Sequence, residues 1–533
     1  MDIDCLPFKE TGYFSNLICD YIEADRKIKT LYKNFPDRAG FQKQLKEKGA
    51  NFPQENRAIL KEALLHQYKD FNVSDNTLHH INSLKESSTF TVVTGHQLNL
   101  FTGPLYFLYK IIATINLAEQ LKKDFPDSNF VPIYWMATED HDFDEINYFN
   151  FQGKKLQWNK DASGAVGHLG TEGLDEVFRI FSSHLGSSKN ALELKDLFEK
   201  AYLENGTLTN ATRFLANELF GEYGLVIVDG GDSRLKRLLI PYAKKDILEQ
   251  KAHSEVSKTI SAIEGLNEGY PIQVNPREIN YFYLHEGLRE RIVEHKDSYV
   301  VNDTAISFTE EELLRELEEH PERFSPNVIA RPLYQEVILP NLCYIGGGGE
   351  IAYWLELKAT FEAMQVPFPI LLLRNSALVI SKKQLKKLDK MQLSVKDLFL
   401  KQNSLINKKI REISNVEIDF TSQKELLENQ FKDLYTLAEQ TDKSFLGAVK
   451  AQEVKQKKGL DHLEKRLLKA QKRKLKDHVV RMTEIQNELF PGKSLQERNL
   501  NFSELYLEYG DGLIPMLKNA LQPLCMEFTV ISL

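Results

Sequence analysis

The chain has 533 residues, of which 42% are hydrophobic, and its formal net charge is -8. A length of this order predicts about three domains, and the hydrophobic fraction can fill a large core, which excludes a disordered or fibrous protein. The acidic charge balance argues against a surface built throughout to hold nucleic acid, although a local basic patch stays open.

Four cysteines, Cys5, Cys19, Cys343 and Cys525, lie far apart in the sequence and form no CxxC pair. In so large a chain this usage predicts reduced thiols in a cytosol. The N-terminus carries acids where a secretory signal has a basic region, and neither apolar stretch, 90–118 or 368–380, is a credible membrane span. We therefore expect a cytoplasmic protein that is not inserted in a membrane.

Residues 1–89 have a mixed helical pattern and are expected to form a helical segment on the core. From Phe90 the β-branched run FTVVTG predicts a strand, and Pro104 opens the helical stretch PLYFLYKIIATINLAEQLKK. The run VPIYWMA then predicts a second buried strand. Strand, helix and strand in succession predict a parallel sheet with right-handed crossovers.

The same alternation continues as far as residue 380. GLVIVDGG predicts a third strand, and RPLYQEVILPNLCYIGGGGEIAYWLELK followed by VPFPILLLRNS predicts a strand, a glycine loop, a helix and another strand. Between them, residues 256–324 are irregular, with a hairpin-like stretch at 270–287. We interpret 90–380 as a Rossmann-like α/β core, with 256–324 as an insertion that shapes a pocket.

Residues 381–490 are charged, nearly free of proline and poor in glycine, which is typical of long coiled-coil helices. Gly447, Gly459 and the polar stretch 403–415 are predicted turns of an antiparallel arrangement. Residues 491–533 then return to the core. The basic stretch KAQEVKQKKGLDHLEKRLLKAQKRKLKDH lacks the interleaved aromatic residues of an RNA-binding surface, so a homodimer through the coiled coil is the favoured interpretation.

Ligands gather at the carboxyl ends of strands in open parallel sheets, and the loop TGHQLNLFTG follows the first strand. It offers Gly95, His96 and Gln97, then Thr102 and Gly103 ahead of a helix whose N-terminal amides suit a phosphate or a carboxylate. The alternative is a plain turn with Thr102 as the helix cap, and we weigh the two evenly.

The second loop, ATEDHDFDE, concentrates hard ligands directly after a buried strand. Glu139, Asp140, His141 and Asp142 are the candidate catalytic residues, and Asp140 and Asp142 could hold a Mg²⁺ ion. The alternative is a solvated acidic turn, the usual fate of a charge run.

The third loop, GGGGE at 346–350, follows the predicted strand that contains Cys343. It matches neither a Walker loop nor GxGxxG, but its four glycines exceed what a tight turn needs, which favours backbone contact with a ligand. The candidate binding residues here and on the flanking strands are Gly346, Gly347, Gly348, Gly349, Glu350, Tyr353, Arg331, Arg374 and Asn375. The two arginines suit a dicarboxylate or a phosphate, although each alone is more often an ordinary ion pair.

Three stretches together, TGHQLNLFTGPLYFLYKIIATI, PIYWMATEDHDFDEINYF and RPLYQEVILPNLCYIGGGGEIAYWLELK, resemble the BshC family of bacillithiol biosynthesis. The resemblance covers essentially the whole chain. It implies a ligase that joins cysteine through an amide to the sugar amine of glucosaminyl malate, the last step of the pathway. Such a condensation requires activation of a carboxylate, which implies ATP, with Mg²⁺ at the acidic loop.

The resemblance also implies a fold similar to class I nucleotidyl-transferases and cysteinyl-tRNA synthetases, whose first strand is followed by an HxGH loop. Gly95 and His96 stand in that place without a second histidine, and SKK at 381–383 is no clear KMSKS loop. Activation as an acyl-adenylate or as an acyl-phosphate therefore stays open. The rival functions are an RNA-linked enzyme similar to a synthetase and a non-catalytic coiled-coil scaffold of the pathway.

Overall fold

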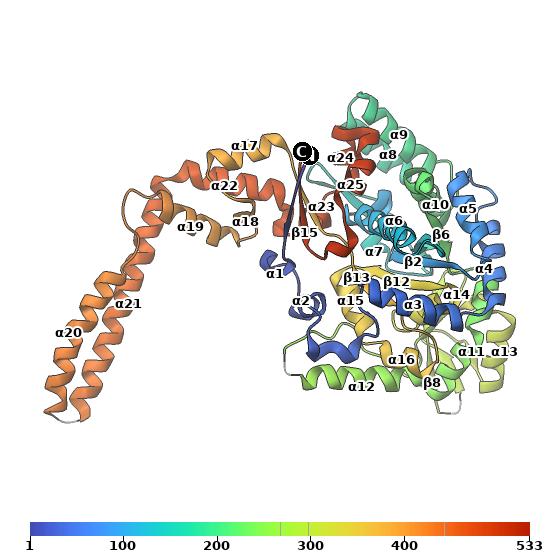
Figure 1. Cartoon of the computed structure of the whole chain (residues 1–533), viewed down its shortest axis with the longest axis horizontal. Coiled ribbons are helices and arrows are strands. Elements are labelled where there is room, and N and C mark those ends of the chain that lie inside the picture. Colours follow the sequence, from blue (N-terminus) through green and yellow to red (C-terminus); the bar gives the residue numbers. More distant parts are fainter. Residues whose placement is uncertain (267, 297, 442) are drawn as a thin grey trace. The chain divides into compact units, whose positions relative to one another are not determined.

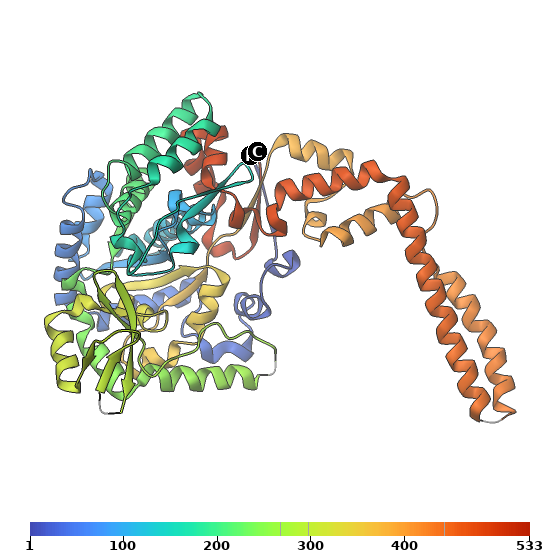
Figure 2. The same ribbon diagram turned by 180° about the vertical axis from the view of Figure 1, so that it is seen from behind.

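A computed structural model describes residues 1–266, 268–296, 298–441 and 443–533. The chain divides into two compact units (Figures 1 and 2). Unit 1 comprises 1–9, 13–378 and 494–531, and unit 2 comprises 10–12, 379–493 and 532–533. Within the described ranges, the structure contains no helix with the length and apolar character needed to span a membrane.

The core of unit 1 is a five-stranded sheet in the order β13-β12-β2-β3-β6, and all its neighbouring strands are parallel. Its strands are β2 (Thr89–His96), β3 (Asn129–Met136), β6 (Val226–Asp229), β12 (Asn341–Gly346) and β13 (Ile370–Leu373). All residues of β2, β12 and β13 are buried, as the apolar and β-branched runs predict for a sheet covered on both faces. The predicted Rossmann-like parallel sheet is confirmed.

The strand order reverses between β2 and β12. From β2 the chain proceeds to β3 and β6 on one side, whereas from β12 it proceeds to β13 on the other. The strands also end level with one another, because His96 is the register partner of Met136, and Met136 that of Asp229. The loops after β2 and β12 therefore diverge at a topological switch point, where open α/β sheets bind their ligands.

Helices cover this sheet. One core cluster joins Phe41 of α3, Leu117 of α6 and the strand residues Val92 and Ile345. The helices of unit 1 that pack around the sheet or follow its strands are α2 (Asn16–Ile22), α3 (Arg38–Asn51), α4 (Gln54–Gln67), α5 (Asp75–Ser83), α6 (Tyr106–Asp124), α7 (Phe143–Ile146), α8 (Leu174–Leu185), α9 (Lys189–Tyr202), α10 (Leu208–Phe220), α11 (Ser233–Glu249), α12 (Lys251–Gly265), α14 (Ala330–Ile338), α15 (Gly348–Leu355) and α16 (Lys358–Ala363).

The sequence predicts a helical segment over the first ninety residues, but the structure is not helical throughout this range. They begin with β1 (Asp2–Leu6), which belongs to a small sheet of order β1-β15-β14 with β15 (Phe528–Ser532) and β14 (Ala377–Ile380). The pairing partner of β1 lies at the other end of the chain, so no local pattern announces this strand. Helix α1 (Phe8–Thr11) follows, and the C-terminal segment adds α23 (Gln496–Asn499), α24 (Phe502–Tyr509) and α25 (Leu513–Ala520).

The insertion forms an antiparallel sheet of its own, in the order β10-β9-β8-β7-β11. Its elements are β7 (Tyr281–His285), β8 (Leu288–His295), β9 (Ser298–Val301), β10 (Ser307–Phe308), α13 (Glu310–Glu319) and β11 (Phe324–Pro326). The hairpin predicted at 270–287 lies later, at β7–β8, because Gly287 with a φ of +67° provides its turn. Residues 270–280 contain no strand. A separate two-stranded sheet pairs β4 (Tyr148–Phe151) with β5 (Lys154–Gln157).

Unit 2 contains the predicted coiled coil. Its helices are α17 (Lys382–Lys390), α18 (Val395–Leu398), α19 (Gln402–Ile413), α20 (Thr421–Glu439), α21 (Lys443–Lys474) and α22 (Lys476–Leu489). Helices α20 and α21 run side by side, with Phe431, Ala438 and Val449 in a shared apolar cluster.

The turns predicted within the coiled coil are wrong. Gly447 and Gly459 both lie inside α21, and most of 403–415 belongs to α19. A glycine in a helix interior lowers the stability of the helix by only about 1 kcal/mol relative to alanine. The surrounding lysine, glutamine and alanine residues of α21 favour the helix strongly enough to offset this loss.

Candidate functional site

A cavity of about 780 Å³ lies in unit 1 at the carboxyl ends of the central strands. It extends from the loops after β2 and β3 to α14, α15 and the insertion. Its lining includes Gly95, His96, Gln97, Tyr106, Lys110, Trp135, Glu139, Asp140, His141, Gln273, Arg277, Phe282, Arg289, Arg291, Arg331, Tyr344, Glu350 and Tyr353. A cavity of this size and place suits a small substrate or a nucleotide.

The cavity wall is basic. Five basic side chains line it, Lys110, Arg277, Arg289, Arg291 and Arg331, against three acidic ones, Glu139, Asp140 and Glu350. Two of those acids are already neutralised by lysines, whereas no ion pair joins any of the four arginines to a carboxylate in the described ranges. The wall therefore presents several guanidinium groups with capacity for an anionic ligand.

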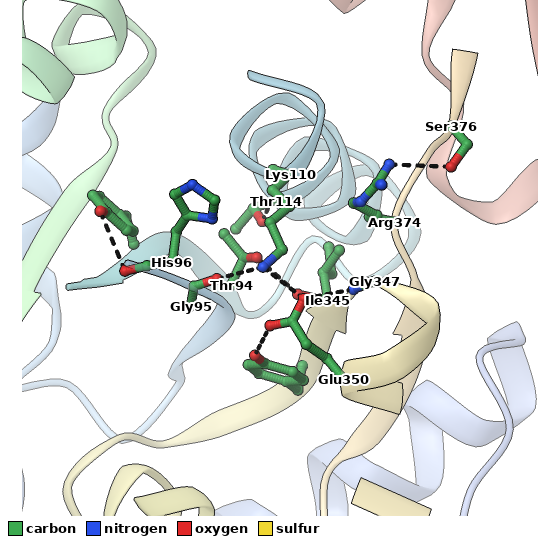
Figure 3. Close-up of polar contacts among 12 residues, drawn as sticks. Thr94, Gly95, His96, Lys110, Thr114, Ile345, Gly347, Glu350, Arg374 and Ser376 are labelled. Atoms are coloured by element: carbon green, nitrogen blue, oxygen red, sulfur yellow. Dashed lines mark hydrogen bonds and ion pairs between the residues drawn. The ribbon is translucent and has the colours of Figure 1, made fainter. Parts of the chain in front are cut away.

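A buried network occupies the switch point between β2 and β12 (Figure 3). Lys110 of α6 donates to the Gly95 carbonyl over 2.6 Å and forms an ion pair of 2.7 Å with Glu350 of α15. Glu350 also accepts from the hydroxyl of Tyr344 and from the amide of Gly347, both over 2.7 Å. The network thus joins the two diverging loops through charge-assisted hydrogen bonds.

The environment keeps this pair ionised. Burial alone would raise the pKa of Glu350, but Lys110 and the hydrogen bonds from Gly347 and Tyr344 outweigh it, so the pKa of the carboxyl lies below its ordinary value. Burial lowers the pKa of Lys110, and Glu350 opposes that effect. The ion pair of Lys110 and Glu350 therefore lies at the cavity wall, with the carboxyl held in its ionised form.

The loop glycines make room for this network. A Cβ atom at Gly346 would lie 2.9 Å from Cβ of Glu350 and 3.0 Å from the Tyr344 ring. At Gly95 it would lie 3.3 Å from the Tyr344 hydroxyl. None of the four glycines at 346–349 has a positive φ, so backbone conformation does not explain their choice. Close approach explains Gly346, whereas a Cβ at Gly348 or Gly349 would meet nothing closer than 3.6 Å and 3.7 Å, respectively.

The acidic loop after β3 divides into buried and solvated parts. Glu139 forms an ion pair of 2.7 Å with the fully buried Lys236 of α11. Asp140 accepts from Gln97 over 2.9 Å and from the His141 amide over 2.7 Å. Asp142 is exposed and does not line the cavity. The loop therefore places Glu139, Asp140 and His141 at the cavity wall, whereas Asp142 belongs to a solvated turn, and the catalytic role of the first three stays a prediction.

His141 is held by a side chain of the insertion. Arg289 donates to Nδ1 of His141 over 2.7 Å, and its guanidinium stacks over the Phe282 ring at 4.0 Å. Because a guanidinium can only donate, Nδ1 must accept and the neutral ring carries its proton on Nε2. In this state His141 offers the cavity a donor rather than a base.

Arg331 lies between two aromatic rings. Its guanidinium is 5.6 Å from the centre of Trp135 and 5.8 Å from that of Tyr344. It donates to the side chain of Gln335 over 3.1 Å. None of these three neighbours carries a charge that would neutralise the guanidinium, which leaves it suited to a carboxylate or a phosphate.

His96 ends β2 and is almost fully buried, with 7% of its surface exposed. Burial lowers its pKa well below the ordinary value, and the cations Lys110 and Arg374 add to this effect. Its ring packs against Tyr106 and Phe107. Nε2 is buried and has no hydrogen-bond partner among the described residues. His96 is therefore a neutral polar group at the cavity.

The family comparison agrees with this architecture. Residues 1–375 match the model described as the N-terminal Rossmann-like domain of bacillithiol biosynthesis BshC, and residues 377–533 match its C-terminal coiled-coil domain. The chain belongs to the BshC family. By compactness, however, 494–531 joins unit 1 rather than the helices of unit 2.

Curated relatives match over nearly full length, and each is named "Putative cysteine ligase BshC". The relative from Christiangramia forsetii is 58% identical over 100% of this chain and 99% of its own. That from Flavobacterium johnsoniae is 58% identical over 100% of both chains. A solved structure from Campylobacter jejuni, described as a putative arginyl t-RNA synthetase, covers 87% of this chain and 98% of its own at 10% identity, but its TM-score of 0.22 is too low for any argument.

The structure brings nine of the eighteen predicted site residues of this BshC-family chain to the lining of the large cavity, and the other nine lie outside it. Thr102 and Gly103 lie outside its lining. Helix α6 begins at Tyr106 with Leu105 as its N-cap and no side-chain cap, so Thr102 is not the cap either. Asn501 instead donates to the Gly103 carbonyl over 2.6 Å and fixes this turn.

Part of the third loop faces a second, smaller cavity of about 200 Å³. Gly348, Gly349 and Arg374 line it, whereas Gly346, Gly347 and Asn375 line neither cavity. Arg374 forms a buried ion pair of 2.7 Å with Glu497, and Asn375 donates to the Gln522 carbonyl over 3.0 Å. For Arg374, the alternative of an ordinary ion pair therefore applies. Arg331 is the arginine of the two that lines the large cavity.

The residues predicted for Mg²⁺ fit it only in part. Asp140 lines the cavity, but Asp142 does not, and one oxygen of Asp140 is engaged by backbone amides of its own loop. Mg²⁺ commonly uses one or two carboxylates together with substrate phosphates and waters. Of the two aspartates only Asp140 reaches the cavity wall, so the pair does not form a two-carboxylate Mg²⁺ site, and we assign no chemical step to a metal.

Sequence reasoning missed Lys110 and the arginines of the insertion, Arg277, Arg289 and Arg291. Lys110 is the single charge within PLYFLYKIIATINLA, and a lone charge on an apolar helix is a usable signal for a buried ion pair. Arg289 and Arg291 alternate along β8, which places them on one face of that strand.

Proposed function

We propose that this protein is a ligase that joins cysteine to the amine of glucosaminyl malate with consumption of ATP, and that the reaction takes place in the large cavity of unit 1. The observation that carries this proposal is the cavity wall of four arginines, none of which has a carboxylate partner among the described residues. Membership of the BshC family and the names of the relatives support the reaction class.

The chemistry of the reactants fits this wall. The malate group carries two carboxylates, cysteine carries one, and ATP carries a polyphosphate, so every reactant brings negative charge to the site. A guanidinium pairs with carboxylate or phosphate through two parallel hydrogen bonds. We assign the malate carboxylates to Arg331, because it lines the cavity beside the Trp135 and Tyr344 rings and donates to the neutral side chain of Gln335.

Amide formation removes an oxygen of the cysteine carboxylate and a proton of the sugar amine. ATP, as a substrate, supplies the activation that makes this oxygen a leaving group, as an acyl-adenylate or an acyl-phosphate. The amine nitrogen then attacks the carbonyl carbon, and a base takes its proton. We assign the base to Asp140, because Nδ1 of His141 is occupied by Arg289 and Glu139 is paired with Lys236.

We also propose that the protein is a homodimer through unit 2. Several large apolar side chains of α20 and α21 are exposed, including Leu426, Leu437 and Leu463. Leu426 and Leu463 line a groove of about 580 Å³ between these helices. Light scattering at several concentrations should give a molecular mass twice that of one chain. A Leu426→Glu/Leu463→Glu variant should give the mass of a single chain.

The activity test uses the purified full chain with cysteine, glucosaminyl malate, ATP and Mg²⁺, followed by mass spectrometry. We expect bacillithiol together with AMP if the intermediate is an adenylate, or with ADP if it is an acyl-phosphate. Arg289→Gln should lower the yield strongly, because it removes one guanidinium and releases His141. Arg179→Gln is the matched control, since Arg179 is an exposed arginine of α8 outside the cavity.

The outcomes separate clearly. Loss of product in Arg289→Gln with full activity in Arg179→Gln supports the site. Absence of product from folded wild-type protein contradicts the proposed reaction. Equal activity of both variants and wild type contradicts the location of the site but not the reaction.

A further inference from the structure

A second group of potential ligands lies outside the large cavity. Cys5 of β1, Cys525 and Glu527 place one ligand atom each within 4.8 Å of one another. The Cys525 sulfur lies 3.6 Å from a carboxylate oxygen of Glu527. The three residues come from the two ends of the chain, and they form the only such group of three or more found in the described residues.

The spacing suits a tetrahedral ion. Zinc is bound by thiolate at about 2.3 Å and by carboxylate at about 2.0 to 2.2 Å, so two ligands at the tetrahedral angle have their sulfur and oxygen about 3.6 Å apart. The Cys525–Glu527 distance equals this value. These two ligands could therefore hold an ion with little movement, and the Cys5 sulfur lies within 4.8 Å of both.

The backbone around the cluster is held before any ion binds. Leu524 and Met526 flank Cys525 and pack against the core cluster that includes residues of the central sheet. The Cys525 amide donates to the Gln522 carbonyl over 3.2 Å, and Asn375 donates to the same carbonyl. Met526 adopts a left-handed conformation with a φ of 50°, which turns the chain into β15. Such preorganisation lowers the entropic cost of ion binding.

We propose that Cys5, Cys525 and Glu527 form a binding site for a thiophilic divalent cation of the Zn²⁺ class. Two thiolates and one carboxylate supply three ligands, and water takes the fourth position. Thiolates select such ions over Mg²⁺ and Ca²⁺, which prefer oxygen ligands. Because Cys5 lies in β1 and Glu527 immediately precedes β15, the bound ion clips the first strand of the chain to the last. This proposal does not rest on the ligase reaction.

Binding requires deprotonated thiols, so each bound ion displaces protons from Cys5 and Cys525 to solvent. The balance is two thiols and a divalent cation giving a dithiolate complex and two protons. No electron is transferred. The cysteines must therefore be kept reduced during the measurement.

The test is a titration of the full chain with Cd²⁺ under anaerobic, phosphine-reduced conditions, recorded in the near ultraviolet. Thiolate-to-cadmium charge transfer should appear and saturate at one ion per chain, with a rise in the thermal unfolding temperature. The acidic loop of the large cavity has no cysteine and gives no such band. The signal is therefore specific to thiolate ligands.

Variants make the site assignment falsifiable. Cys5→Ser and Cys525→Ser should each lose most of the band, and Glu527→Gln should weaken binding by about tenfold or more. Cys19→Ala is the matched control, because Cys19 is a buried cysteine of α2 outside the cluster. Circular dichroism verifies that each variant is folded.

The proposal is overturned if the folded wild type shows no band, or if both cysteine variants keep it. Formation of a Cys5–Cys525 disulfide in air, without metal uptake in the reduced protein, also overturns it. In that case the pair is a redox site rather than a metal site.

Discussion

The central sheet has a buried lysine–glutamate pair at each end of its strands, and the two pairs differ in what surrounds them. Near the amino end of β12, Lys48 and Glu336 are 2.8 Å apart, with 1% and 0% of their side chains exposed. At the carboxyl ends, Lys110 and Glu350 are 2.7 Å apart, with 3% and 28% exposed. The distances are alike, but only the second pair lies in the cavity wall.

The difference lies in the remaining partners. Glu336 also accepts from Asn341 and Gln335, so protein groups surround this carboxylate on all sides. Glu350 faces the cavity, where a ligand can approach. The first pair therefore belongs to the folding of the sheet, whereas the second is available for function.

The largest expected effect is on stability at the amino end. Lys48→Met leaves the buried carboxylate of Glu336 without its cation, which should cost about 3 to 5 kcal/mol of unfolding free energy. Urea denaturation measures this loss. Turnover per folded molecule should stay at the wild-type value.

The exposed pair Lys200–Asp196 provides the control for this variant. Lys200→Met should change stability by less than about 1 kcal/mol. Similar losses in both variants would show that burial does not distinguish the two pairs.

Removing the pair at the carboxyl ends should act on turnover instead. Lys110→Met deletes the cation at the cavity wall, and we expect kcat/KM to fall by about a hundredfold, the effect of losing one preorganised electrostatic partner. The loss of stability should be smaller than in Lys48→Met, because Glu350 is partly hydrated. A Lys110→Met enzyme with wild-type kcat/KM would remove the distinction between the two pairs.

The cavity wall should also respond to pH. Glu356 accepts from the amide of Gln273, a cavity residue, and burial raises the pKa of Glu356 from 4.5 to about 7. The folded state thus binds this proton more tightly than the unfolded state, and stability is lost as pH rises from 4.5 through about 7. The loss should be about 3 kcal/mol.

Glu356→Gln keeps the acceptor for Gln273 but does not titrate. The difference in unfolding free energy between variant and wild type should therefore change across this pH window and be flat above it. A constant difference from acid to neutral pH would contradict the raised pKa.

The smallest effect is expected for His141. Since Arg289 occupies Nδ1, His141→Gln should lower kcat by less than about tenfold, below the 10²- to 10⁴-fold contribution of a general base. The Asp140→Asn substitution should lower kcat by a factor within that 10²- to 10⁴-fold range. The reverse order in steady-state assays would make His141 the base.

Much of the parallel sheet was predictable, because fully buried strands leave long apolar and β-branched runs and their loops collect polar residues at one edge. The position of Glu139, Asp140, His96 and Gln97 at this edge of the sheet was predicted in this way. The coiled coil was equally visible from its composition, but its turns were not, since Gly447 and Gly459 interrupt a stretch of strong helix formers without ending it.

The basic half of the site was not predictable from local pattern. Arg277, Arg289 and Arg291 belong to an insertion whose antiparallel sheet meets the cavity only through tertiary packing. The roles of Arg331 and Arg374 were indistinguishable in the sequence. The partner of Arg374, Glu497, lies more than a hundred residues away, and only the folded chain shows which of the two arginines is already paired.

The most direct test of the account is calorimetric titration of glucosaminyl malate into the wild type, Arg331→Gln and Arg179→Gln. Our account predicts binding that weakens with salt, a loss of at least about tenfold in affinity for Arg331→Gln, and no change for Arg179→Gln. Equal affinities for all three proteins would contradict the claim that the arginine-lined cavity is the substrate site.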